Sequence, residues 1–241
     1  MKFYHSNILN NFADLKHAFT TRDSGNLAFH VGDDELSVQE YHELLAQELE
    51  YEKNSLIYMN QIHSDIVHIV KDEGFNTPPT CDALVTNKPN TPLMVMVADC
   101  SPILFYDNEK KVIAAAHAGR AGAFKNIINN VVQTMQSAFG TKVENLHVSI
   151  GATIGVCCYE VGSEIYKEAK GLGLEYAMQK REDSFYLDIN KILLSQLSAC
   201  GINSENIGFL NECTCCNTQH YFSYRAEAKT GRFAGVIMLN Q

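Results

Sequence analysis

The sequence lacks long apolar runs, internal repeats and low-complexity linkers. Its longest apolar stretches, such as residues 91–98, are far shorter than the roughly 20 residues that a membrane-spanning helix needs. The first twelve residues lack the basic start and apolar core of a secretory signal peptide. We therefore expect a cytoplasmic protein with no membrane partner, folded as a single domain over residues 1–241.

Basic residues are in the minority. The chain carries 19 Lys and Arg against 28 Asp and Glu, for a net charge of -9. It also has no cluster of lysines and arginines, the feature that marks a nucleic-acid-binding surface. We expect no nucleic-acid partner.

The eight cysteines are not spaced like the disulfide framework of a small secreted protein. In a reducing compartment, such thiols are buried, bound to metal or catalytic. Cys158, Cys213 and Cys216 form one candidate thiolate site, because residues 213 and 216 have CxxC spacing. The second CxxC pair of a structural zinc site is missing, and the adjacent Cys157 rarely ligates the same ion as its neighbour.

Periodicity predicts short strands mixed with helices. A capping box formed by Ser37 and Glu40 predicts a helix over residues 37–50. Further helices are expected at 121–139, 163–169 and 189–199. The expected strands are 56–59, 66–70, 83–86, 93–98, 103–106, 112–116, 146–150, 207–210, 221–224 and 236–239. Hairpin-like spacing with packed helices favours an α+β fold, with a mixed, largely antiparallel sheet.

Three possible metal ligands stand where predicted strands end. His63 lies between two strands, Cys100 interrupts the apolar run "VADCSPILFYD", and His117 closes "AAAHAG". Two imidazoles and one thiolate can hold a catalytic zinc and leave the fourth position for water or substrate. Taken singly, each residue has a plainer interpretation: a structural histidine, a small buried hydrophobe and a polar strand end.

The residues after His117 suggest an anion site. Gly119 and Gly122 lead from a strand into a helix, where backbone N–H groups favour an anion, although a tight turn alone would also need them. Arg22, Arg225 and Arg232 are candidate clamps for the same anion.

Acidic candidates stand at strand boundaries: Asp65, Asp82 and Asp99. Asp99 is expected either to orient a ligand histidine or to accept a proton. Its plainer interpretation is a carboxylate that caps the turn.

Together these segments resemble the YfiH-like family, whose members are often labelled polyphenol oxidases or laccase-domain proteins. The resemblance runs through "NQIHSDIV", "CDALVT", "VADCSPILFYD", "AAAHAGRAG", "IGVCCYEVG" and "YFSYRAEAKTGR". It implies that His63, Cys100 and His117 bind zinc, with Cys100, Asp99 and His117 as catalytic residues. The implied substrate-binding residues are Asn26, Arg22, Gly119, Arg225 and Arg232.

The resemblance also implies the reactions. These are phosphorolysis of adenosine, inosine and S-methyl-5′-thioadenosine, and deamination of adenosine to inosine, so purine nucleosides and phosphate are the expected partners. Two departures bear on substrate binding: the family's usual His-Ala-Gly-Trp-Arg-Gly is "HAGRAG" here, and its Ser-Tyr-Arg-Arg is "SYRA". Arg120, Ala121 and Ala226 occupy the changed positions.

Two other classes of enzyme fit some of the residues. A peptidoglycan-precursor hydrolase would use Cys100 as nucleophile and His117 as base. A multicopper oxidase needs many clustered histidines, whereas the chain has nine and no His-x-His pair. Copper at the same three residues is possible, and the number of subunits is left open.

Overall fold

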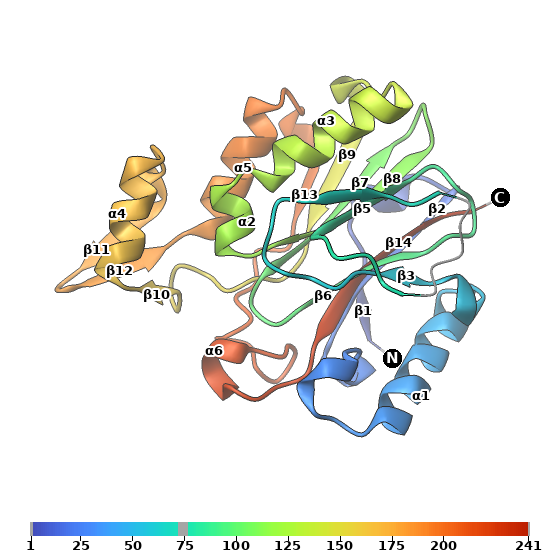
Figure 1. Cartoon of the computed structure of the whole chain (residues 1–241), viewed down its shortest axis with the longest axis horizontal. Coiled ribbons are helices and arrows are strands. Elements are labelled where there is room, and N and C mark those ends of the chain that lie inside the picture. Colours follow the sequence, from blue (N-terminus) through green and yellow to red (C-terminus); the bar gives the residue numbers. More distant parts are fainter. Residues whose placement is uncertain (1, 72–76, 241) are drawn as a thin grey trace.

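The computed structural model describes residues 2–71 and 77–240, which form three sheets flanked by helices (Figure 1). The six-stranded sheet has the order β13-β9-β7-β8-β5-β4. Its strands are β4 (Val67–Ile69), β5 (Ala83–Thr86), β7 (Ser101–Asp107), β8 (Val112–Ala118), β9 (Leu146–Ile150) and β13 (Ile207–Phe209). The outer strands β4 and β13 pair in parallel with their neighbours, and the inner pairs are antiparallel.

The five-stranded sheet has the order β1-β2-β14-β6-β3. Its strands are β1 (Phe3–Tyr4), β2 (Leu15–Thr20), β3 (Ile57–Tyr58), β6 (Leu93–Val97) and β14 (Phe233–Leu239). Residues of β2, β6 and β14 share one buried apolar cluster with residues of β7 and β8. The two larger sheets therefore pack against each other through a common core.

Helices cover the outer faces of these two sheets (Figure 1). On the six-stranded sheet lie α2 (Arg120–Phe124), α3 (Ile127–Phe139) and α5 (Ile189–Ala199), whose apolar side chains join those of β5, β7 and β8 in a second core. On the five-stranded sheet lies α1 (Glu35–Glu48). A short helix, α6 (Tyr224–Glu227), precedes the last strand. The mixed α+β architecture is confirmed.

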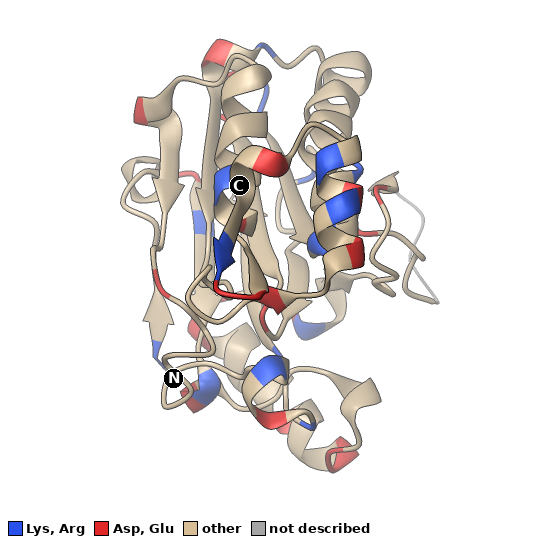
Figure 2. Cartoon of the chain, turned by 90° about the vertical axis from the view of Figure 1, so that its left-hand side faces the viewer, with Lys and Arg blue, Asp and Glu red and all other residues tan. Residues whose placement is uncertain are grey.

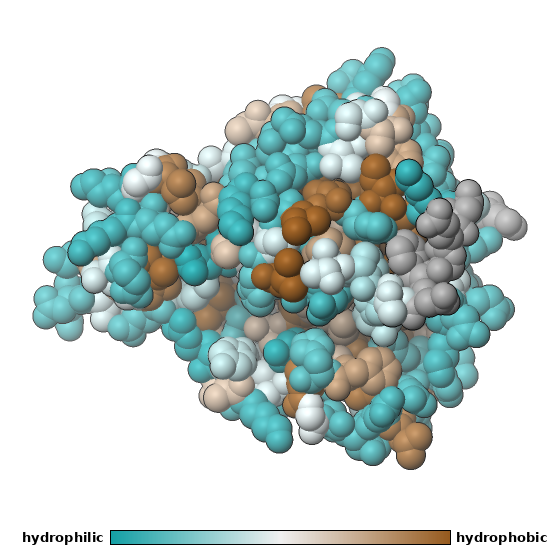
Figure 3. Space-filling view, viewed as in Figure 1, coloured by the Kyte–Doolittle hydropathy of each residue, from teal (hydrophilic) through white to brown (hydrophobic). Residues whose placement is uncertain are grey.

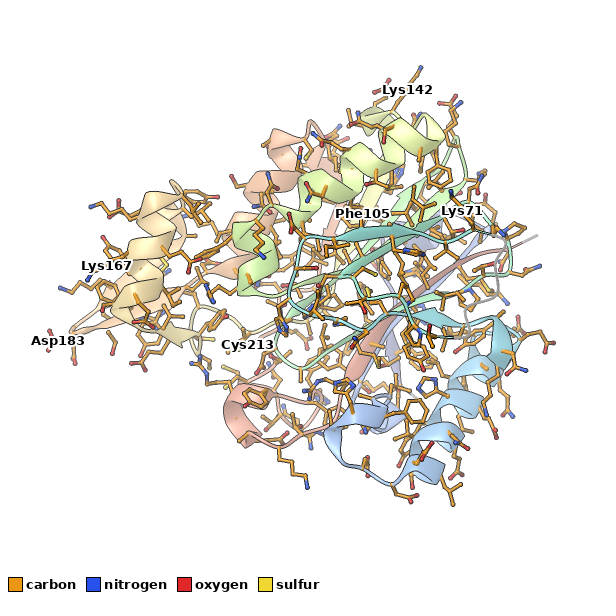
Figure 4. All side chains as sticks on the ribbon, viewed as in Figure 1. Lys71, Phe105, Lys142, Lys167, Asp183 and Cys213 are labelled. Carbon is orange, nitrogen blue, oxygen red and sulfur yellow. The ribbon has the colours of Figure 1, made fainter. Side chains whose placement is uncertain are left out.

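A small third sheet extends from one side of the molecule (Figures 1 and 4). It contains β10 (Glu160–Val161), β11 (Met178–Arg181) and β12 (Ser184–Leu187), and it carries α4 (Ser163–Gly171). We call this segment, residues 160–187, the arm. On the face that the arm presents, basic and acidic residues are intermixed rather than sorted by sign (Figure 2).

Several predicted strands differ by a few residues at their ends, and β1, β2, β10, β11 and β12 were not predicted. Three further differences have a local cause. The first helix begins after Asp34, whose carboxylate accepts a hydrogen bond from Ser37 N–H, so Ser37 is not the N-cap. The expected helix over 121–139 is broken at Asn126, which has a left-handed conformation (φ 62°) and caps α3. Residues 221–224 form no strand, since α6 begins at Tyr224.

Two further observations concern the helices and the surface of the protein. Within residues 2–71 and 77–240, no helix combines the length and apolar character needed to cross a bilayer. Figure 3 shows apolar side chains gathered across the middle of the face viewed in Figure 1.

Candidate functional site

The turn that carries Cys100 is the point where the chain passes from one sheet to the other. β6 belongs to the five-stranded sheet and β7 to the six-stranded sheet, with Ala98, Asp99 and Cys100 between them. Asp99 adopts a positive φ of 89°, which is strained for a residue with a side chain. The apolar run is therefore interrupted because the chain changes sheets here, and this exposes a thiol at the junction.

Three segments bring the predicted ligands together. His117 lies near the end of strand β8, and His63 lies in the loop after β3, where it has a φ of 58°. The Sγ atom of Cys100 lies 3.9 Å from Nε2 of His63, and the ring centroids of His63 and His117 are 4.8 Å apart. One ligand atom from each of the three residues lies within 4.8 Å of the others.

Asp82 orients the ring of His117 and anchors the backbone of the loop that carries His63. Its carboxylate accepts hydrogen bonds from Nδ1 of His117 (2.8 Å) and from the backbone N–H of His63 (3.0 Å). It also accepts from the backbone N–H of Ile62 and from the N–H and hydroxyl of Ser64. With Nδ1 donating to Asp82, His117 directs Nε2 toward Cys100, as a metal-binding histidine does.

Asp82 was among the acidic candidates named from the sequence, and strand register explains its role. Ala83 of β5 pairs with Ala116 of β8, so Asp82 stands opposite His117, and the His117 N–H donates to the Asp82 carbonyl (2.7 Å). The orienting role that the sequence assigned to Asp99 is therefore filled by Asp82. The Asp99 carboxylate instead accepts from the Thr214 hydroxyl and the Arg225 N–H, both at 2.6 Å.

The charges of these groups depend on one another. Burial would raise the pKa of the Cys100 thiol, but the adjacent imidazoles of His117 and His63 outweigh this and lower it. Burial would lower the pKa of His117, but the Cys100 thiolate and the Asp82 carboxylate raise it. Burial would likewise raise the pKa of Asp82, but hydrogen bonds from His117 and Ser64 bring it down to about 2. Without metal, the site favours a thiolate beside an imidazolium.

Gly119 is required by the closeness of the three ligands. A Cβ atom at this position would lie 2.9 Å from Sγ of Cys100 and 3.0 Å from Cδ2 of His63. Its φ of -79° would suit any residue, so contact with the site excludes a side chain here. Gly122 has a packing role, since a Cβ there would lie 3.1 Å from the Ser64 carbonyl oxygen.

The three residues fit a zinc ion. Tetrahedral zinc with thiolate and imidazole ligands places the ligand atoms about 3.5 Å apart, close to the separations here. The donors are of the type that zinc prefers, and the hydrogen bond from His117 to a buried carboxylate is usual in zinc sites. The same donor types also accept copper. The residues therefore make a possible metal site without selecting the metal.

The group lies in a pocket of about 970 Å³. His63, Cys100 and His117 all line it, as do Gly119, Arg225 and Arg232. The Arg225 guanidinium donates to the carbonyls of Cys158 and Glu160, both at 2.9 Å. The Arg232 guanidinium donates through Nη1 to the carbonyls of Thr230 and Gly231.

Two predicted substrate-binding residues do not line the pocket. Arg22 forms an ion pair with Glu227 and donates to the carbonyl of Tyr221. Asn26 is buried, and its Oδ1 accepts the backbone N–H of Arg232 (2.8 Å). Asn26 thus fixes the backbone of Arg232 without lining the pocket itself, while the Arg22 guanidinium is paired with Glu227.

The structure also reveals pocket residues that the sequence analysis missed. Phe29 and Tyr58 bring aromatic rings to the pocket, and Tyr159 brings a phenol. Phe29 is 41% exposed and is stacked on His42, with ring centroids 5.3 Å apart. Isolated aromatic residues in a sequence carry no signal that would distinguish them from core residues.

Arg120, which stands where the family resemblance leads one to expect tryptophan, also lines the pocket. Its guanidinium donates to the Glu168 carboxylate on α4 (2.7 Å) and lies over the Phe124 ring. Arg120 therefore joins the pocket to the arm. Ala121, on the same short helix, leaves no second guanidinium there.

Known proteins resemble the chain over most of its length. The family model described as multi-copper polyphenol oxidoreductase laccase matches residues 16–240. A purine nucleoside phosphorylase of Corynebacterium glutamicum is 34% identical over 237 residues, covering 93% of this chain and 94% of that protein. A purine nucleoside phosphorylase of Clostridium acetobutylicum is 36% identical over 183 residues, or 75% of each chain.

Solved structures agree with these matches. The hypothetical protein YfiH of Bacillus licheniformis superimposes with a TM-score of 0.89 at 27% identity, covering 94% of this chain and 93% of that one. A DUF152 protein of Neisseria meningitidis gives a TM-score of 0.88 at 27% identity, with both chains fully covered. These matches confirm the resemblance inferred from the motifs.

Proposed function

Since the chain belongs to the YfiH and DUF152 family, described as multi-copper polyphenol oxidoreductase laccases, we propose that it is a purine nucleoside phosphorylase. Its substrates would be adenosine, inosine and S-methyl-5′-thioadenosine, together with phosphate, and it would also deaminate adenosine. We further propose that residues 1–241 act as one domain.

The observation that carries this proposal is the position of the His63, Cys100 and His117 group within a large pocket. The pocket volume lies at the upper end of the roughly 300–1,000 Å³ range of small-molecule sites, enough for a nucleoside beside a phosphate ion. The pocket also combines an exposed aromatic ring, Phe29, with the cationic Arg232. These are the chemical types that bind a purine face and an anion.

Phosphorolysis assigns separate tasks to these residues. A phosphate oxygen forms a bond to C1′ while the C1′–N9 bond breaks, and the electron pair leaves with the purine, which then takes a proton. Arg232, whose backbone N–H donates to Asn26, would orient the phosphate. Tyr159 lies in the same pocket, and burial, together with the negative charges of Cys100 and Asp99, raises its pKa to about 12. A phenol that stays protonated can donate a hydrogen bond to the departing base.

Deamination draws on the metal site. Zinc held by His63, Cys100 and His117 would supply Lewis acidity and lower the pKa of a water, which is what hydrolysis at C6 of adenine requires. The protein's own part is to hold the His117 imidazole in the metal-binding tautomer and the His63 backbone in place, both through Asp82. Arg120, in place of the family's usual tryptophan, alters the wall of the pocket and hence its substrate preference.

A second candidate rests on one observation. Cys100, His117 and Asp82 together have the roles of a thiol nucleophile, a base and an orienting carboxylate. A hydrolase of peptidoglycan precursors would use this arrangement without metal. A free thiolate reacts rapidly with iodoacetamide, whereas a metal-bound thiolate is protected.

The test compares wild type with Cys100→Ala, and uses Cys200→Ala as the matched control, because Cys200 is a free thiol outside the pocket. Zinc and copper content are measured, and adenosine is supplied with and without phosphate. We expect phosphate-dependent adenine and phosphate-independent inosine from wild type and from Cys200→Ala. Cys100→Ala should form neither product and should bind one zinc ion per chain fewer. A metal-free protein that leaves adenosine unchanged, and whose Cys100 reacts readily with iodoacetamide, would support the hydrolase instead.

A further inference from the structure

A second group of potential metal ligands lies outside the pocket group. The sulfur atoms of Cys157, Cys158, Cys213 and Cys216 all lie within 4.8 Å of one another. We call these residues the four-cysteine cluster. Figure 4 shows Cys213 between the main sheets and the arm. Neither the phosphorolysis nor the deamination proposed above uses any of these thiols.

We propose that the four-cysteine cluster binds one zinc ion, which joins a loop that lines the pocket to a loop that holds the pocket residue Asp99 in place. Sγ of Cys216 lies 3.5 Å from Sγ of Cys157 and 3.3 Å from Sγ of Cys158. Four thiolates around one tetrahedral zinc ion stand about 3.8 Å apart, so modest outward shifts would produce the required geometry. Tetrahedral sites with four sulfur ligands are characteristic of zinc or iron–sulfur centres.

The surrounding backbone is arranged for thiolates. The Gly155 N–H donates to Sγ of Cys213 at 3.2 Å. A Cβ atom at residue 155 would lie 3.2 Å from Cβ of Cys213, so a glycine lets the two loops approach.

The cluster is poorly suited to a disulfide bond. Cys216 is close to both Cys157 and Cys158, so neither pair is singled out, and all four cysteines are free. Without metal the four thiols cannot all ionise together, whereas a zinc ion neutralises the thiolates and displaces their protons.

The two loops carry groups that shape the pocket. Thr214, between Cys213 and Cys216, donates to the Asp99 carboxylate (2.6 Å). Tyr159, directly after Cys158, lines the pocket, and the Cys158 carbonyl accepts from Arg225. A bound ion would therefore hold the pocket wall in place without touching substrate.

The test counts metal in chains that lack one site or the other. Full-length protein is produced with zinc as the added metal, and zinc is measured per chain after gel filtration. We expect about two zinc ions for wild type and about one for Cys100→Ser, Cys213→Ser or Cys216→Ser. Cys215→Ser and Cys200→Ser serve as controls and should retain the wild-type content, because both residues lie outside the two groups.

A second measurement applies if the cluster variants fail to fold. Cys100→Ser is reconstituted with cobalt, and its absorption spectrum is recorded. A tetrahedral thiolate site gives intense sulfur-to-cobalt charge-transfer bands, which added zinc should abolish. Metal-free Cys100→Ser, iron with labile sulfide, a disulfide within the cluster, or loss of zinc from Cys215→Ser would each overturn the proposal. Because the pocket ligand is removed in this variant, the outcome does not depend on nucleoside turnover.

Discussion

Replacing Asp82 with asparagine should weaken metal binding without removing any ligand. The Asp82 carboxylate is fully buried and accepts from His117, from Ser64 twice and from two further backbone N–H groups. An asparagine offers only one oxygen, and its NH₂ group donates. If the NH₂ faces His117, Nδ1 must accept a hydrogen bond, and the proton moves to Nε2, the atom needed for the metal. If the NH₂ group faces Ser64, it meets the Ser64 N–H and hydroxyl, which also donate, and those hydrogen bonds are lost.

The size of the effect follows from these contacts. Loss of a hydrogen-bonded partner to a metal-binding histidine typically costs 10- to 100-fold in metal affinity. The unmatched donors also destabilise the fold, since a hydrogen bond to a charged group contributes roughly 1.5–3 kcal/mol. For Asp82→Asn we expect zinc affinity reduced by about 10- to 100-fold and the free energy of unfolding lowered by about 3 kcal/mol.

The assay is competition for zinc with a chromogenic chelator, alongside urea unfolding of the metal-free protein. Asp107→Asn is the matched control, because Asp107 is equally buried and accepts two backbone N–H groups, but it lies at the other end of β7. It should lose stability and keep its zinc affinity. Wild-type zinc affinity in Asp82→Asn would refute the orienting role, and an equal loss in both variants would assign the effect to general destabilisation.

Three further substitutions test other parts of the structure. Gly119→Ala should weaken zinc binding at least tenfold by crowding Cys100, whereas Gly171→Ala, with open space around it, should not; equal binding by both would contradict the steric argument. Burial lowers the pKa of His17 to about 4, so folding stability should be full above pH 6.5 and fall by about 2–3 kcal/mol on going to pH 4.5. His17→Gln should flatten this dependence in urea titrations, and an unchanged slope would exclude His17 as its source. Arg232→Ala should raise the KM for phosphate by about 10- to 100-fold in steady-state assays, and an unchanged KM would remove it from the phosphate site.

The sequence was sufficient where local patterns decide structure. Strands β5 and β9 and helix α5 have the predicted bounds, because their apolar periodicity and flanking turns are local signals. The sequence pattern also indicated that His63, Cys100 and His117 stand where strands end. The break at Asn126 was missed, because a left-handed residue between two apolar helical segments leaves the periodicity almost unchanged.

Contacts between distant segments were not predictable in this way. Asp82 was a candidate from the sequence, but its orienting role follows only from the register of β5 against β8. Asp99 was given that role because it stands next to Cys100 in sequence. Arg22 was assigned to the pocket from its residue type, yet it pairs with Glu227, more than two hundred residues away. The direction in which a polar side chain points depends on which strands pair, and a single sequence leaves that open.

The family's laccase description implies a reaction for which the described residues lack ligands. A multicopper oxidase needs an electron-entry copper and a three-copper cluster, with many imidazoles close together. Within residues 2–71 and 77–240, only two groups of three or more potential ligands form, and only two histidines belong to either of them. One copper at His63, Cys100 and His117 is the most that the pocket can hold. Copper-loaded protein should therefore fail to reduce oxygen to water with a phenol as electron donor, while the zinc-loaded protein cleaves nucleosides. Oxygen uptake with four phenols oxidised per oxygen, abolished in Cys100→Ala, would refute this conclusion.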